Sequence, residues 1–184
     1  KNINKLMPGV SISVLTFNFC KPIFENNPHL AEIYGLSGKA DREEFSRLAG
    51  QLTQKNFDLI INLHAKNSSI KLLKKVQARW KISGSYFIRG KYPGVFIGSD
   101  HALDRSSIER DLDCLRAIGL TPQDKTPEIF LTDAENQWAE DFMINQKIDS
   151  SKKLIIIHPS SSKSWTDWGL ERFTVLSRRL IHDH

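Results

Sequence analysis

The sequence predicts an α/β protein organised around a parallel sheet, and three observations lead to this fold class. The run Phe57–Leu63 (FDLIINL) is apolar on both alternating faces, as in a strand buried within a parallel sheet. Amphipathic helical patterns alternate with apolar runs along the chain. The connections between them are short, which is typical of repeated β-α-β units. We therefore expect a doubly wound parallel sheet.

Each expected strand is a short aliphatic or β-branched run next to residues that favour turns. The first run follows Pro8-Gly9, and the last breaks at His158-Pro159. The stretch from Gly84 to Gly98 is rich in glycine and aromatic residues, so we expect an irregular surface loop there. In chain order, the expected strands are Val10–Phe17, Phe57–Leu63, Trp80–Ile88, Glu128–Leu131 and Leu154–Ile157.

The expected helices follow from helical apolar spacing and from capping residues at their ends. Asp41 is expected to cap one helix, and Glu44 completes a capping-box pattern with it. Gly119 is expected to end another helix, and Thr132 or Asp133 to cap the next. In chain order, the expected helices are the tail of one at Asn2–Met7, a short one at Pro22–Asn26, and then Arg42–Gln54, Ser68–Ala78, Ile108–Ile118, Glu135–Asn145 and Leu170–Ile181.

The composition is that of an ordinary globular protein, with 40% hydrophobic and 26% charged residues among 184. No run of about 18 apolar residues is present, so no membrane span is expected. Cys20 and Cys114 are isolated, which favours reduced thiols in the cytoplasm. The net charge of +5 favours anionic partners, which leaves nucleic acid, phosphorylated sugars and an anionic membrane surface open.

A turn suited to phosphate lies within Lys153–Phe173 (KLIIIHPSSSKSWTDWGLERF), between the last expected strand and the last expected helix. Hydroxyl groups, a cation and the amides of a helix start can together bind phosphate oxygens. The hydroxyls belong to Ser160, Ser161 and Ser162, and the cation is Lys163. The alternative is that Lys163 is a solvated loop residue and that the serines cap the helix.

Five segments, in this order along the chain, carry a resemblance to a known family. They are PGVSISVLTF, ENNPHLAEIYGL, FDLIINLHAKNSS, HALDRSSIERDLDCLRAIGL and IIIHPSSSKSWTDWGLERFTVLSRRL. With this order and spacing, the chain resembles glycosyltransferase family 9, the ADP-heptose:lipopolysaccharide heptosyltransferases. The resemblance implies a GT-B fold, in which two Rossmann-like domains face a cleft. The acceptor then lies on the N-terminal side and the nucleotide sugar on the C-terminal side.

On this resemblance, the chain is a Rossmann-like parallel-sheet domain plus the first β-α unit of a second Rossmann-like domain. Residues 1–148 are expected to form the acceptor-side domain without its first strand, and residues 149–184 the truncated start of the nucleotide-sugar domain. The carboxylate proposed as the family's general base is expected in a segment that is not present, so no catalytic residue is named. The partial chain is therefore expected to be inactive alone.

The resemblance places the donor phosphates at the serine-rich turn, where the family has H-P-G-(small)-(S/T) followed by K-x-W-P. Lys163 is the expected phosphate contact, together with Ser160, Ser161 and Ser162. Aligning the helix on Trp168 instead puts Thr166 at the lysine position. Trp165 and Trp168 then either stack on the adenine or pack the helix against the sheet, and packing is the expectation for Trp168.

The expected acceptor-binding residues follow the carboxyl end of Phe57–Leu63, where open α/β sheets bind ligands. The family commonly has D-x-Q-G there, followed by a basic residue. The candidates in this chain are His64, Lys66 and Ser68, and the alternative for His64 is a hydrogen bond within the turn. The chain departs from the family pattern at Asn62, Ala65, Ser68, Ser160 and Gly169, which leaves the acceptor open.

The implied reaction is inverting transfer of heptose from ADP-heptose to the lipopolysaccharide inner core, without a metal ion or other cofactor. The expected partners are the nucleotide sugar, the inner-core acceptor and, through peripheral contact, an anionic membrane surface. Nucleic acid is not expected, because no nucleic-acid-binding motif is present. We expect a cytoplasmic protein, peripheral at the inner face of the inner membrane. The alternatives are a GT-B glycosyltransferase that uses another nucleotide sugar or a protein acceptor, and a non-catalytic binding module on the same scaffold.

Overall fold

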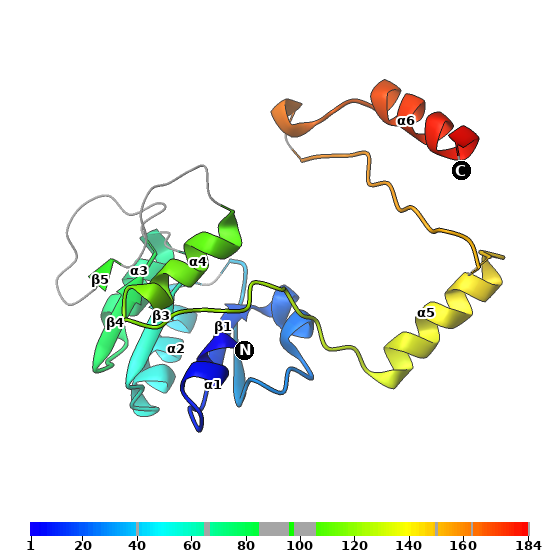
Figure 1. The fold of residues 1–184 in the computed structure, drawn as a ribbon. Coiled ribbons are helices and arrows are strands. Elements are labelled where there is room, and N and C mark those ends of the chain that lie inside the picture. The colour runs from blue at the N-terminus through cyan, green and yellow to red at the C-terminus, as the bar shows by residue number, and fades with distance from the viewer. Residues whose placement is uncertain are drawn as a thin grey trace. The chain divides into compact units, whose positions relative to one another are not determined.

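The computed structural model describes residues 1–39, 41–64, 67–84, 96–97, 106–149, 151–162 and 164–183 (Figure 1). The chain divides into two compact units, Lys1–Leu131 and Thr132–His184, which we call unit 1 and unit 2. The predicted domain boundary after residue 148 stays a prediction.

Among the described residues, the strands of unit 1 form two sheets in which every pairing is parallel. In the first sheet, β1 (Ser13–Phe17) pairs with β2 (Glu32–Leu36). In the second, the order is β3 (Leu59–Asn62), β4 (Trp80–Ser83) and β5 (Phe96–Ile97). The α/β class and the parallel pairing predicted from the sequence are therefore confirmed.

Helices connect and cover these strands (Figure 1). They are α1 (Asn2–Leu6), the 3-10 helix η1 (Asn18–Phe24), α2 (Arg42–Gln54), α3 (Asn67–Lys75) and α4 (Ser107–Arg116). The bounds of α2 are those predicted, whereas α3 ends before the predicted Ala78 and η1 begins before the predicted Pro22. Gly119 follows α4 with a φ of 82°, a conformation that glycine adopts without steric cost.

One apolar cluster holds both sheets of unit 1. It is built from Leu48, Ala49 and Leu52 of α2, Leu72 of α3, and Val76, which directly follows α3. Leu15 from β1 and Ile60 from β3 both pack against it. α2 and α3 therefore carry the core that the two sheets share, and this holds β1 and β3 in one unit although they belong to different sheets.

β2 is not predicted by the sequence pattern, because it contains a glycine and glycine weakens a strand pattern. A side chain at Gly35 would lie 1.8 Å from the Asn18 side chain of η1. The glycine therefore allows η1 to pass close over β2, and tertiary packing, which no short pattern reveals, makes the segment a strand.

In unit 1, two predictions about strands are wrong. Glu128–Leu131 is extended but forms no strand, and both Ile129 and Leu131 are exposed. An apolar run becomes a strand only when a neighbouring strand pairs with its N–H and C=O groups, and no described strand does so here. Within the loop predicted from Gly84 to Gly98, Phe96–Ile97 instead pairs with β4. Most of that loop, and the predicted strand residues after Gly84, lie outside the described residues.

The start of α2 differs in one respect from the predicted capping box. Asp41 accepts a hydrogen bond from the backbone N–H of Glu44 at 2.8 Å, as a capping residue does. The Glu44 carboxylate does not return this bond to Asp41. It accepts from the backbone N–H of Ser37 at 2.9 Å and from the Ser37 hydroxyl. The carboxylate thus joins α2 to the end of β2, and these bonds lower the pKa of Glu44.

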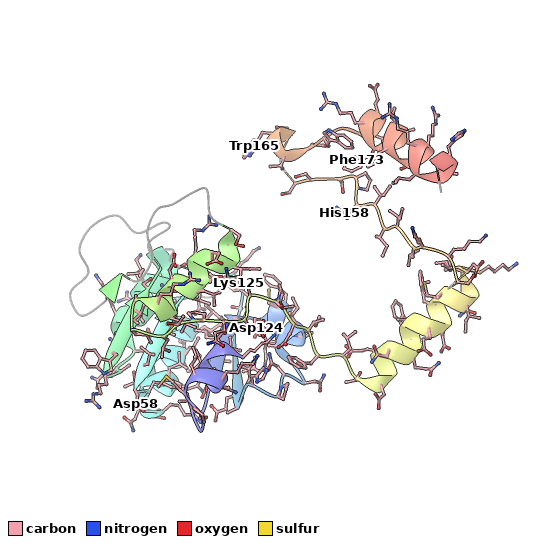
Figure 2. All side chains as sticks on the ribbon, viewed as in Figure 1. Asp58, Asp124, Lys125, His158, Trp165 and Phe173 are labelled. Atoms are coloured by element: carbon pink, nitrogen blue, oxygen red, sulfur yellow. The ribbon has the colours of Figure 1, made fainter. Side chains whose placement is uncertain are left out.

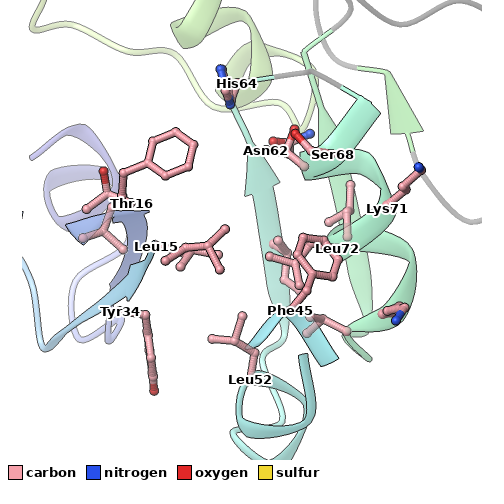
Figure 3. A pocket seen from close by; sticks show the side chains of 18 of the residues that line it. Leu15, Thr16, Tyr34, Phe45, Leu52, Asn62, His64, Ser68, Lys71 and Leu72 are labelled. Carbon is pink, nitrogen blue, oxygen red and sulfur yellow. The ribbon is translucent and has the colours of Figure 1, made fainter. Parts of the chain in front are cut away.

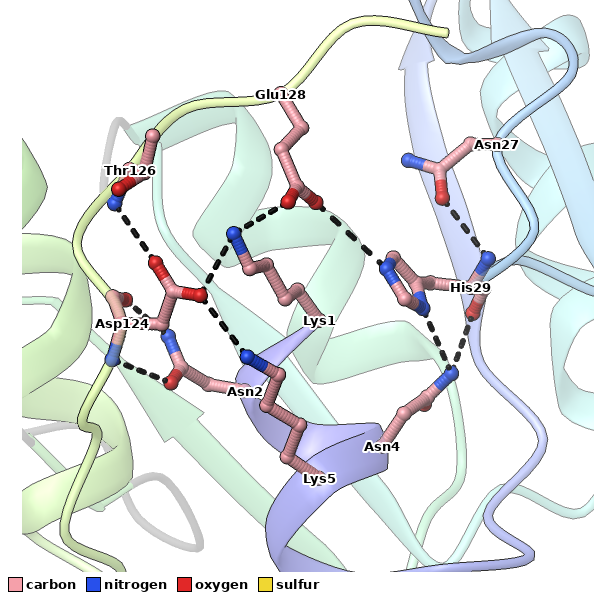
Figure 4. Close-up of polar contacts among 9 residues, drawn as sticks. All are labelled: Lys1, Asn2, Asn4, Lys5, Asn27, His29, Asp124, Thr126 and Glu128. Carbon is pink, nitrogen blue, oxygen red and sulfur yellow. Dashed lines mark hydrogen bonds and ion pairs between the residues drawn. The ribbon is translucent and has the colours of Figure 1, made fainter.

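α1 is held to the segment after α4 by polar contacts (Figure 4). Asn2 donates to the main-chain oxygen of Asp124 at 2.6 Å, and the Lys1 ammonium lies 2.7 Å from the Asp124 carboxylate and also pairs with Glu128. Lys5 adds a contact of 3.0 Å to Asp124. The hydrogen bonds from Lys1 and Lys5 hold the pKa of Asp124 well below its usual value. Two segments about 120 residues apart are therefore joined at this point.

Unit 2 contains α5 (Asp133–Asn145), the short 3-10 helix η2 (Ser164–Thr166) and α6 (Leu170–Asp183). Thr132 and Glu135 form a reciprocal capping box at the start of α5, which confirms Thr132 as the cap. The strand predicted at Leu154–Ile157 is wrong, because these residues are extended without a pairing strand. No described residue of unit 2 is buried. In the described part of the chain, no helix has the length and apolar character needed to cross a membrane.

Candidate functional site

The first group of predicted site residues lies at the carboxyl end of β3 in unit 1. His64 comes two residues after this strand and is exposed, and Ser68 is exposed in the first turn of α3. Lys66, the third predicted acceptor residue, lies outside the described residues. The sheet topology therefore places His64 and Ser68 at the edge where parallel α/β sheets bind ligands.

His64 lies against the end of β1. Its ring meets the ring of Phe17 edge to face, with centroids 6.4 Å apart, and Phe17 in turn stacks on Phe19 at 5.5 Å. The carboxyl ends of β1 and β3 are therefore at the same end of the unit. Phe17 was not among the predicted site residues, because nothing in a short aromatic-containing strand distinguishes a site residue from a packing residue.

Asn62 stands where the related family commonly has an acidic residue, and in this structure its side chain is used to join strands. Its amide donates to the hydroxyl of Ser83 on β4 at 2.9 Å. Ser83 is fully buried and donates in turn to the main-chain oxygen of Gly84 at 3.1 Å. A carboxylate at position 62 would lack the N–H that makes this contact. Asn62, which replaces the acidic residue common in the family, thus has a polar partner on the neighbouring strand.

A cavity of about 1200 Å³ lies between β1 and β3 (Figure 3). Its apolar lining comes from both strands and from α2 and α3, including Leu15, Phe45, Leu52 and Leu72. Polar side chains, among them Thr16, Asn62, His64, Ser68 and Lys71, also line it. In Figure 3, His64, Asn62 and Ser68 lie toward one end and Tyr34 and Leu52 toward the other. The predicted acceptor residues His64 and Ser68 therefore share one cavity.

The second group of predicted site residues lies in unit 2, on the turn that leads into α6. Ser160, Ser161, Ser162 and Thr166 are all exposed, and the hydroxyls of Ser161 and Thr166 are hydrogen-bonded to each other. Lys163 lies outside the described residues. The structure thus brings two of the predicted hydroxyl residues, five positions apart, to one point of the turn.

The start of α6 is shaped by Asp167 and Gly169. The Asp167 carboxylate accepts the backbone N–H of Gly169 at 2.8 Å, and Gly169 has a φ of 90°. The family's usual proline cannot adopt this conformation, since its ring fixes φ near about −65°. The first intrahelical bond is the one from the Phe173 N–H to the Gly169 oxygen at 3.3 Å. The N–H groups of the three residues between them have no acceptor within the helix and so point out of its first turn.

The two tryptophans of this turn differ. Trp168 meets Phe173 of α6 edge to face, with ring centroids 5.0 Å apart, so it packs on the helix. The side chain of Trp165 is 78% exposed. Figure 2 shows both His158 and Trp165 on the segment before α6, outside any sheet. Trp165 is therefore the more exposed of the two tryptophans, since Trp168 is 46% exposed.

Two other kinds of site receive no support from the described residues. No group of three or more His, Cys, Asp or Glu side chains among them could hold a metal ion. Cys114 is completely buried, and burial raises the pKa of its thiol to about 11, so it is not a reactive nucleophile.

The chain is similar to known proteins in both sequence and fold. Residues 45–184 match the model of glycosyltransferase family 9 (heptosyltransferase). The chain is 26% identical over 179 residues to lipopolysaccharide heptosyltransferase 3 of Escherichia coli (strain K12), an alignment that covers 91% of this chain and 50% of the relative. A solved structure of a family 9 glycosyltransferase from Veillonella parvula DSM 2008 matches with a TM-score of 0.76 at 18% identity, over 95% of this chain and 52% of that one. The chain thus spans about half the length of these relatives.

Proposed function

Since the chain belongs to glycosyltransferase family 9, the heptosyltransferase family, we propose that the protein of which it forms part transfers heptose from ADP-heptose to the lipopolysaccharide inner core. The observation that carries this proposal is the family match over residues 45–184, which includes both the residues around His64 and the turn before α6. The proposed architecture is GT-B, with the acceptor bound by unit 1 and the nucleotide sugar by the domain that begins in unit 2.

The turn before α6 suits the donor diphosphate. The bonded hydroxyls of Ser161 and Thr166 and the amides of the first turn of α6 supply neutral donors, and Lys163 supplies the positive charge. These groups would stabilise the negative charge that builds on the departing diphosphate, so the reaction needs no metal ion for this step. The Gly169 N–H is already bound by Asp167 and is not counted among the phosphate donors.

The cavity edge at His64 suits the acceptor. The side chains of His64 and Ser68 carry hydrogen-bonding groups, and Lys66 carries a charge that would pair with an acidic or phosphorylated inner-core sugar. Inverting transfer also needs a base that removes the proton of the attacking hydroxyl. We expect that base to be a carboxylate outside residues 1–184. We also propose that the reaction takes place at the cytoplasmic face of the inner membrane.

The test is titration calorimetry and a transfer assay on the longer parent polypeptide, with ADP, ADP-heptose and lipopolysaccharide that lacks the terminal heptose. We expect binding of ADP-heptose and release of ADP only when the acceptor is present. Release of ADP from ADP-heptose with a different acceptor, or transfer from another nucleotide sugar alone, would reassign the substrates while keeping the reaction class.

Replacement of Lys163 measures the donor contact directly. Lys163→Ala in the parent polypeptide is expected to weaken ADP-heptose binding by about 1–3 kcal/mol, the usual cost of losing a charge-assisted hydrogen bond. Lys152→Ala is the matched control, because Lys152 is an exposed lysine of the same unit whose partner is Asp149 at 3.8 Å. An equal loss in both variants would show that the effect is general electrostatics and not a phosphate contact.

A second candidate function is a non-catalytic binding module. It is favoured by Asn62, whose side chain bonds to Ser83 of β4 where the family commonly has an acid. This candidate predicts that the parent polypeptide binds nucleotide sugar but releases no ADP with any inner-core acceptor. Turnover with one acceptor excludes it.

A further inference from the structure

An exposed aromatic ring lies beside the candidate acceptor residues. Phe19 is on η1, two residues after the end of β1, and its side chain is 74% exposed. Its ring stacks on the ring of Phe17, with centroids 5.5 Å apart, and Phe17 in turn contacts His64 edge to face. Phe19 is therefore two ring contacts from His64, at the edge where parallel α/β sheets bind ligands.

The local fold turns Phe19 outward. Within η1, the side chains of Cys20, Lys21 and Phe24 are half-buried, whereas those of Phe19 and Ile23 are exposed. A phenylalanine that serves only to pack unit 1 is expected to turn inward as Phe24 does, since exposure leaves its apolar surface in water. Packing of the core therefore does not explain the position of the Phe19 ring.

Stacking on Phe17 leaves one face of the Phe19 ring open. The two ring planes are nearly parallel, with an angle of 7° between them, so Phe17 covers only one face of Phe19. The loop after β2 lies at the edge of the ring, because a Cβ at Gly38 would be 3.9 Å from the Phe19 Cε1 atom. Phe17 thus fixes the orientation of the ring, and the opposite face is free to contact a ligand.

A second exposed aromatic residue of unit 1 shows why the position of Phe19 matters. Of the aromatic side chains that the structure describes in this unit, Phe19 and Trp80 are exposed. Trp80 begins β4 beside Leu59, at the amino end of the strands, and the Arg79 guanidinium lies 5.9 Å from the centre of its ring. Trp80 is therefore at the opposite end of the sheet from His64, and only Phe19 of the two is at the ligand-binding edge.

The open face of an aromatic ring suits a sugar. A sugar ring carries C–H bonds that pack on the electron-rich face of an aromatic ring, while its hydroxyl groups remain available for hydrogen bonds. His64, in contact with Phe17, carries hydrogen-bonding groups at the same edge. Lys39 directly follows Gly38 and is exposed, and its charge is suited to acidic or phosphorylated sugars. An acyl chain, in contrast, packs equally well on an aliphatic side chain and needs no aromatic ring.

We propose that Phe19 is a stacking surface for one sugar ring of the acceptor, and that Phe17 holds the Phe19 ring in position. This inference rests on the proposed function, because it needs an acceptor that is bound by unit 1. It extends the acceptor site from the end of β3 to η1. The acceptor is then recognised by the shape of a sugar ring as well as by charge and hydrogen bonds.

The test is calorimetric titration of the longer parent polypeptide with lipid-free inner-core oligosaccharide. Phe19→Ala should weaken oligosaccharide binding about three- to tenfold, the usual effect of losing one aromatic stacking contact. Phe19→Trp should keep the affinity, because it keeps an aromatic face. Phe19→Leu should lose as much affinity as Phe19→Ala, because leucine supplies apolar surface but no ring. In a transfer assay, Phe19→Ala should raise the KM for the acceptor and leave kcat nearly unchanged.

Two matched variants and one second ligand control this experiment. Trp80→Ala removes the other exposed aromatic ring of unit 1, and Ile23→Ala removes an exposed apolar side chain of η1 itself. Neither should change the affinity for the oligosaccharide. The affinity for ADP-heptose should be the same in every variant, which shows that each variant is folded.

The outcomes separate this inference from the proposed function. Unchanged oligosaccharide binding in Phe19→Ala overturns the stacking surface and leaves the proposed function standing. Full affinity in Phe19→Leu, or an equal loss in Trp80→Ala, also overturns it, because the effect would then not depend on an aromatic ring at this position. A parent polypeptide that binds ADP-heptose but no inner-core oligosaccharide contradicts the proposed acceptor, and the stacking surface with it.

Discussion

Unit 1 and unit 2 contain similar kinds of apolar run, but they use them differently. The buried apolar residues of the described chain, from Leu48 to Leu115, all lie in unit 1. In unit 2, Leu154, Ile155 and Ile156 form an aliphatic run as strong as that of β3, yet each is at least half exposed. The difference is the presence of pairing strands and covering helices, which unit 1 has and the described part of unit 2 lacks. An aliphatic run therefore shows that a segment is able to be buried. The neighbouring strands and helices determine whether it is buried.

The largest expected effect comes from a matched pair of isoleucines, one in each unit. Ile82 on β4 is 2% exposed and Ile156 is 84% exposed. Ile82→Ala should lower the free energy of unfolding by about 2–5 kcal/mol, because it leaves a cavity in a packed core. Ile156→Ala should change it by less than about 0.5 kcal/mol, as an exposed substitution does. Urea unfolding of the 184-residue chain, followed by circular dichroism, measures both.

The same two variants can also contradict this difference between the units. If Ile156→Ala costs as much as Ile82→Ala in the 184-residue chain, unit 2 has a packed core of its own. If the cost at Ile156 is small in this chain but reaches the range of Ile82 in the longer parent polypeptide, further strands pair with Leu154–Ile157 there. The second result would restore the strand predicted from the sequence in its complete setting.

The next largest expected change in stability comes from two glycines with positive φ, one in each unit. Gly119 follows α4 with a φ of 82°, and Gly169 precedes α6 with a φ of 90°. A Cβ at either position meets nothing within 4 Å, so alanine there tests backbone strain alone. Gly119→Ala should cost about 1–2 kcal/mol of the stability of unit 1. Gly169→Ala has no core to oppose the strain, so we expect the start of α6 to rearrange while the urea midpoint of unit 1 stays unchanged.

Gly50→Ala is the control for this pair. Gly50 lies within α2, and a Cβ there also meets nothing within 4 Å, but its backbone is helical. Alanine should therefore raise stability by about 0.5–1 kcal/mol, which is the opposite sign. A loss of stability at Gly50 as well would mean that the added methyl group is unfavourable even in a helical backbone, so positive φ would not be the cause.

Sequence reasoning predicted the elements whose signals are local. The cap at Asp41 and the bounds of α2 depend on a few adjacent residues, and both agree with the structure. β2 was missed, because the close approach of Asn18 to Gly35 is a tertiary contact. Glu128–Leu131 was wrongly predicted as a strand, because the pattern cannot show whether a partner strand is available.

For the candidate site too, the sequence predicted what depends on local signals and missed what depends on tertiary contacts. The sequence placed His64 and Ser68 after a strand, and the structure puts both on one cavity. It could not show that the Asn62 side chain is bonded to Ser83 on a strand 21 residues away, nor that Phe17 meets His64.

The smallest expected change in stability comes from polar contacts of carboxylates, which are long-range in unit 1 and local in unit 2. Glu109 on α4 pairs with Lys125, which lies beyond the helix, and with Arg116 at 2.7 Å; hydrogen bonds from these two groups lower the pKa of Glu109 to about 2. In unit 2, the pKa of Asp149 is lowered by hydrogen bonds from its close neighbour Ser151.

A carboxylate whose pKa is lowered on folding contributes stability above its unfolded pKa and loses it as the pH falls through the folded value. For Glu109 the loss therefore occurs between about pH 4.5 and about pH 2. Thermal unfolding of Glu109→Gln should show a reduced melting temperature at pH 7. The difference in melting temperature from the parent should vanish near pH 2, and added salt should make this difference smaller.

Asp149→Asn should leave the melting of unit 1 unchanged at every pH, because its contacts stay within one turn of unit 2. A pH-dependent shift of unit 1 in Asp149→Asn would instead show that the two units are energetically coupled, and the contrast between them would no longer hold.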